Sequence, residues 1–164
     1  MQYHVSGPCI VKFGTDGGTT EIGTCKNGVR IEARTNWIPV TDQLHGNTPA
    51  TYIFGGKSAT VTMLGLDCSK LKAKKTSLWP MTMLSTGGST WIGKTASAMA
   101  CQLEILENGS DSADWVALWA VCRQPSELVL SSVQEVQVPL VWLILPDASK
   151  KLFDTYPAWL KPTA

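Results

Sequence analysis

The chain has 164 residues, of which 44% are hydrophobic and 16% are charged, and this length is enough to bury a core without metals or disulfides. Its 14 basic and 13 acidic residues give a net charge of +1, which excludes a protein that holds nucleic acid or an anionic membrane through overall charge. The five cysteines, at positions 9, 25, 68, 101 and 122, show no CxxC spacing, so we expect buried thiols in a reducing cytosol and neither a zinc site nor a disulfide framework.

The first half of the chain is dominated by the alternating pattern of strands. Residues 8–13 predict a short strand, the Gly-rich stretch 14–20 predicts a turn, and Asn27-Gly28 is a strong turn dipeptide. The clearest strand covers 29–37, where apolar residues alternate with charged or polar ones. This pattern indicates a sheet with one packed face and one wet face. A second alternating strand is predicted over 57–66.

The second half carries one helix signal and three further strand signals. A helix is predicted at about 69–76, and strands are predicted over 98–107, 115–123 and 133–145. Pro139 lies inside the last of these, which implies an edge position or a bulge. The N-terminus lacks a signal-peptide pattern and no apolar stretch is long enough to cross a bilayer, so we expect no membrane association.

These elements predict an all-β fold, a two-sheet β-sandwich or barrel with one short helix. We expect a single domain over 1–146 and a C-terminal extension over 147–164. Because the extension combines prolines with Tyr156 and Trp159, we expect it to be extended and to contact other subunits through these two aromatic residues.

The stretch between the two clearest strands, residues 39–57, is much longer than a hairpin turn needs. Its middle, 42–49, is polar. Paired as a hairpin it would reach about 30 Å at about 3.3 Å per residue, against a radius of gyration of about 15 Å for a compact domain of this size. We therefore predict a protruding arm that another copy of the chain covers; the alternative is a loop folded back on its own domain. The predicted contact residues are Asp42, His45, Asn47, Pro49, Tyr52 and Phe54.

No set of residues predicts catalysis, a metal site or a cofactor. The stretch GTDGGTT lacks the Lys-Ser/Thr and the helix of a phosphate-binding loop, and His4 and His45 lack convergent partners. Glu104 and Glu107 point to opposite faces of a strand, which argues against a paired-carboxylate site. The basic run 70–75 is expected to be a solvated face. An enzyme is therefore the least favoured class.

Two segments resemble the tail tube proteins of tailed bacteriophages, a family related to contractile injection and secretion tubes. The first is GVRIEARTNWIPVTDQLHGNTPATYIFGGKSATVTMLGLD, and the second is EVQVPLVWLILPD, which is similar to that family's last strand. Together they cover about a third of the chain. The first segment matches the family's order of a strand, a loop with an acidic residue, Gly and Pro, and a Gly-led strand at Asp42, Gly46, Pro49, Gly55, Gly56 and Asp67.

The resemblance implies a structural virion protein of the phage tail, made in the bacterial cytoplasm. Six subunits would form a ring with a continuous inner β-barrel, and rings would stack into a hollow tube through the arm. The implied partners are a tape-measure protein in the lumen, the passing genome, a tail terminator and, in a contractile tail, a sheath. A lumen needs polar walls, and the polar strand residues that would line it are Arg30, Glu32, Arg34, Asn36, Ser58, Thr60 and Thr62.

Several alternatives stay open at this stage. Arginines suit a DNA-conducting lumen poorly, so either Glu32 and cross-strand acids offset them or this face is the outside. A tube-initiating or tail-terminating ring protein would share the fold. A monomeric β-sandwich binding module is the alternative from another class, with Trp79 and Trp91 as a sugar platform.

Overall fold

The computed structural model describes residues 2–14, 20–67, 93, 95–123 and 137–160. The predicted helix at 69–76 lies outside these residues, as do Trp79 and Trp91. The described elements are β1 (Gln2–Val5), β2 (Cys9–Gly14), β3 (Thr20–Cys25), β4 (Val29–Val40), β5 (Thr51–Asp67), the 3-10 turn η2 (Ala96–Met99), β6 (Cys101–Leu106), β7 (Trp115–Arg123), β8 (Gln137–Ile144) and the 3-10 turn η3 (Ala158–Leu160).

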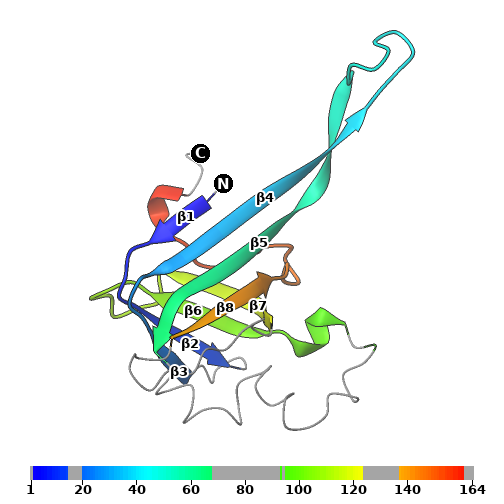
Figure 1. The fold of residues 1–164 in the computed structure, drawn as a ribbon. Helices are drawn as coiled ribbons and strands as arrows, with labels where there is room; N and C mark the ends of the chain where they lie inside the picture. The colour runs from blue at the N-terminus through cyan, green and yellow to red at the C-terminus, as the bar shows by residue number, and fades with distance from the viewer. Residues whose placement is uncertain (1, 15–19, 68–92, 94, 124–136, 161–164) are drawn as a thin grey trace.

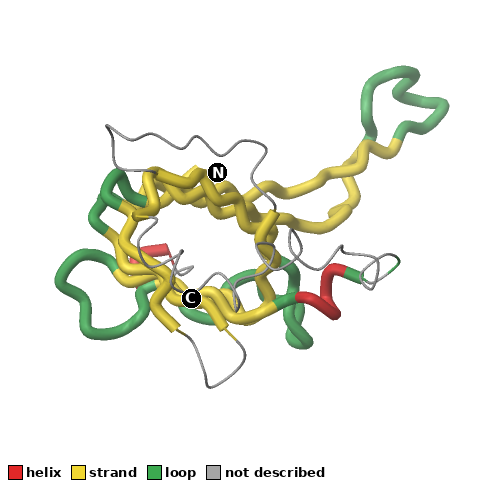
Figure 2. The backbone as a smooth tube through the Cα atoms, turned by 60° about the horizontal axis from the view of Figure 1, so that its bottom comes forward, coloured by secondary structure: helices red, strands yellow, loops and turns green. Residues whose placement is uncertain are grey.

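The strands form one antiparallel sheet that closes on itself. The strand order is β1-β4-β5-β3-β2-β6-β7-β8, and an additional pairing of β8 with β5 joins the two sides. Viewed from one end, the strands outline a ring (Figure 2). The all-β prediction is confirmed, and the described strands adopt the barrel form of the predicted sandwich or barrel.

Alternation along each strand builds the core inside this ring. On β2 the odd positions from Cys9 to Phe13 are buried and the intervening residues are half-buried. Trp142 of β8 is fully buried: its ring lies 4.5 Å from that of Phe13, and its indole nitrogen lies 3.2 Å from the sulfur of Met63. Side chains from the strands therefore fill the barrel, and apolar burial of this kind is the main stabilising contribution.

The turn between β3 and β4 depends on a glycine. Gly28 has a φ of 85°, and a Cβ atom there would lie 2.1 Å from the carbonyl oxygen of Val5. Only glycine fits both the conformation and the close approach. Beside this turn, Val5 of β1 pairs with Val29 at the start of β4.

The strand predictions for the first half are confirmed in kind, but β4 and β5 are longer than predicted. They run to Val40 and from Thr51, so that only 41–50 is a loop. Pro139 falls where the β5–β8 register shifts between Met63 and Leu66, so the predicted bulge is confirmed. Residues 98 and 99 belong to η2 and not to the predicted strand, and β1 was not predicted, because four residues are too few for a clear period.

The C-terminal segment differs from the predicted extended arm over its described part. Leu152 is buried in the core, Thr155 forms a β-bridge with Val116, and the ring of Phe153 lies 5.3 Å from that of Trp115. The adjacent apolar residues Leu152 and Phe153 pack on the barrel. Trp159 is the exception, because it is 74% exposed.

Candidate assembly interface

The hairpin of β4 and β5 projects away from the barrel as an arm (Figure 1). We define the arm as residues 34–58. The two strands pair from Val29–Met63 at the barrel to Val40–Thr51 at the far end. The predicted protrusion is therefore present, and the alternative of a loop folded back on its own domain is not.

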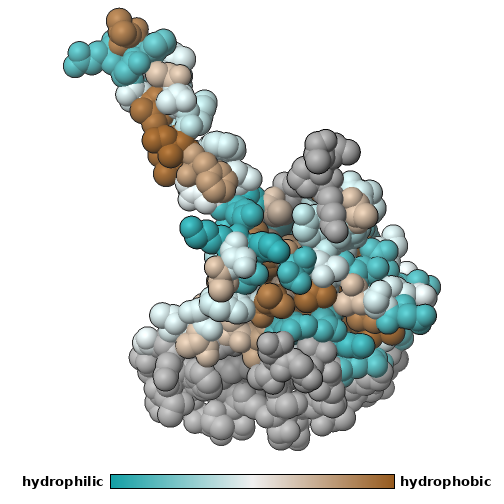
Figure 3. Space-filling view, turned by 180° about the vertical axis from the view of Figure 1, so that it is seen from behind, coloured by the Kyte–Doolittle hydropathy of each residue, from teal (hydrophilic) through white to brown (hydrophobic). Residues whose placement is uncertain are grey.

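The arm carries apolar side chains on both of its faces. Trp37 pairs with Phe54 and Pro39 with Tyr52 on one face, while Ile38 pairs with Ile53 on the other. The large apolar residues of this pairing, Trp37, Ile38, Tyr52, Ile53 and Phe54, are all between 48% and 57% exposed. Apolar side chains gather between the tip and the body in the space-filling view (Figure 3). A soluble monomer rarely exposes such a ribbon, and a lone two-stranded hairpin is marginally stable in water.

A bulge interrupts the strand pairing near the root of the arm. The register shifts between Asn36 and Trp37, so that Asn36 pairs with Gly56 and Trp37 pairs with Phe54. A Cβ atom on Gly55 would lie 2.9 Å from side-chain atoms of Asn36 and Ile38, so a larger residue there would displace these side chains. On the barrel side of the bulge, buried apolar residues alternate with more exposed polar ones. Beyond the bulge, both faces of the hairpin carry apolar side chains.

The backbone edges of the arm lack partner strands. β1 pairs with β4 only as far as Glu32, and β8 pairs with β5 only from Ala59 onward. In the part of the chain that the structure describes, no other strand pairs with β4 over 34–40 or with β5 over 51–58. An exposed edge of this length is a template for pairing with another chain.

The tip of the arm is ordered by Asp42. Its Oδ1 atom accepts a hydrogen bond from the backbone amide of His45 at 2.8 Å and lies 2.7 Å from the ring Nδ1 atom of His45. The side-chain hydrogen bond with His45, followed by that from the His45 backbone amide, lowers the pKa of Asp42 below its ordinary value. Between them lies Leu44, which is 93% exposed. The tip therefore presents a carboxylate beside a projecting apolar side chain.

The polar residues predicted to face a lumen share one surface of the barrel and the arm root. Arg30 pairs with Thr62, Glu32 with Thr60, and Arg34 with Ser58, while the residues between them point into the core. Arg34 donates a hydrogen bond to Glu32 at 3.4 Å. The cross-strand neighbours are hydroxyl residues on β5 and Gln2 and His4 on β1, so among these described residues only Glu32 offsets part of the arginine charge. An exposed pair of this kind stabilises little.

The predicted contact residues fall into two places. Asp42, His45, Asn47, Pro49, Tyr52 and Phe54 all lie on the arm. Tyr156 and Trp159 lie on the C-terminal segment, where Tyr156 is half-buried and the Trp159 ring lies 6.1 Å from that of Tyr3.

Sequence reasoning did not single out Trp37, Ile38 or Leu44 as contact residues. Trp37 continues the apolar face of the alternating strand over 29–37, which predicted a packed position for it, and Ile38 lies just beyond that predicted strand. Leu44 had a usable signal: it is a lone large apolar residue in a polar loop.

The described residues contain no group of three or more His, Cys, Asp or Glu side chains able to hold a metal ion. No helix in this described part of the chain is long and apolar enough to cross a membrane. The Glu104 carboxylate accepts a hydrogen bond of 2.6 Å from Gln102. Among the described residues, the surface feature that stands out is the apolar arm.

Neither a scan against protein-family models nor a search of curated proteins finds a match for this chain.

Proposed function

We propose that the chain is a subunit of a phage tail tube, in which hexameric rings stack into a hollow conduit for genome delivery. The observation that carries the proposal is the arm, whose apolar faces and backbone edges have no cover within the described chain. A sister copy that packs on the arm removes this surface from water and pairs the edges.

The arm and the barrel are different surfaces, so a contact between them is heterologous. Heterologous contacts build rings when the rotation closes and filaments when it does not, and a stacked tube contains both kinds. The order of strand, Gly/Pro-containing loop and Gly-led strand over 28–67, which resembles tail tube proteins, selects the tube among such assemblies.

The polar surface that contains Arg30, Glu32 and Thr60 faces the lumen in this proposal. Its hydroxyl row on β5 is uncharged, and the Arg34–Glu32 pair offsets one of its two arginines. DNA slides along such a wall more easily than along a strongly basic one. A tape-measure protein occupies the lumen before the genome passes.

Negative-stain electron microscopy of the purified chain tests the proposal. Long hollow tubes are the expected result. Single rings would assign the chain to a tube initiator or tail terminator, and separate monomers at micromolar concentration would overturn the proposal in favour of a monomeric binding module.

A deletion of residues 42–49 tests the role of the arm in this assembly. The deletion removes the tip and leaves the barrel strands intact, so the subunits should fold and fail to form long tubes. Tubes like those of the unmodified chain would contradict a stacking role for the arm.

A further inference from the structure

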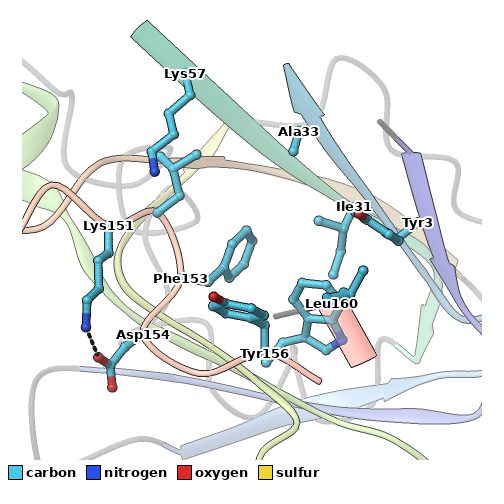
Figure 4. A pocket seen from close by; sticks show the side chains of 11 residues that line it. Tyr3, Ile31, Ala33, Lys57, Lys151, Phe153, Asp154, Tyr156 and Leu160 are labelled. Carbon is cyan, nitrogen blue, oxygen red and sulfur yellow. Dashed lines mark ion pairs between the residues drawn. The ribbon is translucent and has the colours of Figure 1, made fainter. Parts of the chain in front are cut away.

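A pocket of about 560 Å³ opens at the root of the arm. One wall is formed by β1 and β4 through Tyr3, Ile31 and Ala33, and the other by the C-terminal segment through Phe153 and Tyr156 (Figure 4). This volume lies in the range of small-molecule pockets and is large enough to admit a leucine side chain.

The chemistry of the pocket is an apolar interior with a cationic rim. Aromatic and aliphatic side chains form the interior, and Lys57 and Lys151 lie at the edge. Lys151 is already paired with Asp154, with 3.6 Å between Nζ and Oδ1. Lys57 forms no ion pair with any residue that the structure describes. The pocket therefore fits an apolar group that has an anion beside it.

The tip of the arm has this chemistry. Leu44 is 93% exposed, and the Asp42 carboxylate lies two residues before it in the same turn. We infer that Leu44 of one copy inserts into the pocket at the arm root of a neighbouring copy, with Asp42 beside Lys57. This inference rests on the proposed function, in which the arm is covered by another copy of the chain.

The tip cannot reach the pocket of its own chain. Lys57 pairs with Thr35 at the root, and the ribbon continues through its paired rungs to Val40 and Thr51. Five further residues at about 3.3 Å each place the end of the ribbon roughly 17 Å beyond Lys57. Leu44 and the pocket belong to the same chain but cannot meet within it. The contact therefore repeats from one copy of the chain to the next.

Sedimentation velocity over a concentration series of the full chain measures the inferred contact. Leu44→Asp should weaken self-association by about tenfold or more, because a leucine that is buried in the contact between copies is replaced by a charged side chain. Leu44→Met keeps an apolar side chain of similar size and should stay within about threefold of the unmodified chain. Leu44 is exposed, so neither change should alter the thermal midpoint of the subunit.

A double-mutant cycle tests the pairing of the two charges. Asp42→Asn keeps an oxygen acceptor for the His45 amide and removes the charge, and Lys57→Gln removes the opposite charge. If the groups meet, the double variant loses less association than the sum of the two single losses; independent sites give the sum. Lys150→Gln is the matched control, because Lys150 is exposed and does not line the pocket.

The outcomes separate this inference from the proposed function. Tubes that form equally well from Leu44→Asp, with additive charge effects, overturn the pocket contact and leave the tube proposal standing. Association that depends on Leu44 and Lys57 but gives no tube or ring supports the contact and overturns the tube. A stoichiometric small-molecule adduct in native mass spectrometry, with association indifferent to Leu44→Asp, assigns the pocket to that molecule and overturns the contact.

Discussion

Trp37 and Phe54 face each other across the arm, with ring centroids 5.6 Å apart and planes at 71°. Each is more than half exposed, at 55% and 54%. An edge-to-face pair of this kind contributes about 0.5–1.5 kcal/mol beyond its burial. The pair helps to hold the two arm strands together, but it leaves most of its apolar surface for a partner.

The double variant Trp37→Ser, Phe54→Ser tests whether this aromatic pair contacts a partner. The barrel core does not include either residue, so the thermal midpoint of the barrel should change little. Self-association should fall by at least about tenfold, because two large apolar contacts are lost. Thr51→Ser, on the same arm, is the control. Unchanged assembly would show that this face of the arm is not covered by a partner.

The stability of the barrel should depend on Trp142. It is fully buried against Phe13 and Met63, so Trp142→Ala should lower the free energy of unfolding by about 3–5 kcal/mol. Trp159→Ala is the matched control at a 74% exposed position and should cost about 1 kcal/mol or less. Urea denaturation measures both. Equal losses of unfolding free energy would contradict the burial of Trp142 in the core of the closed barrel.

The pH response of the arm tip should follow Asp42. Its pKa is lowered from 3.8 chiefly by the side-chain hydrogen bond with His45. The contribution of the carboxylate to the turn is therefore fully present above about pH 4 and is lost as the pH falls through the lowered pKa. Carboxyl NMR titration should place the Asp42 midpoint below 3.8, and His45→Ala should raise it. A wild-type midpoint at or above 3.8 would contradict the hydrogen bond.

The cysteines inside the barrel should react slowly with alkylating reagents. Burial raises the pKa of Cys25 and Cys122 to about 12 and that of Cys9 to about 11. Because the thiolate is the reactive form, iodoacetamide at pH 8 should label these residues at least about a hundredfold more slowly in the folded chain than in denaturant. Peptide mass spectrometry measures each site separately. Rapid labelling in the folded chain would indicate that the barrel opens.

Local patterns predicted the individual strands but not how they meet. The alternation over 29–37 identified β4, and the same pattern on β5 gave its buried face. Closure of the barrel depends on the pairing of β5 with β8, which lie far apart in the sequence and are joined by no turn signal.

The candidate interface was predicted as a segment and less well as a set of residues. Length and polarity marked 39–57 as a protruding arm. The bulge at Asn36 and Gly55 was not predicted, because it depends on which residue of β5 faces which residue of β4. That one-residue shift places Trp37 opposite Phe54 and Ile38 opposite Ile53. The pocket at the root joins β1 to the C-terminal segment, a contact that no sequence period encodes.

Amide hydrogen exchange on the arm, measured at low and high protein concentration, shows whether a sister copy covers it. We expect the amides of 34–40 and 51–58 at the outer edges to exchange freely in dilute subunits and to become protected in the assembled state. Barrel amides should be protected in both. Exchange on the arm that is equally fast at every concentration would contradict the claim that a sister copy covers it.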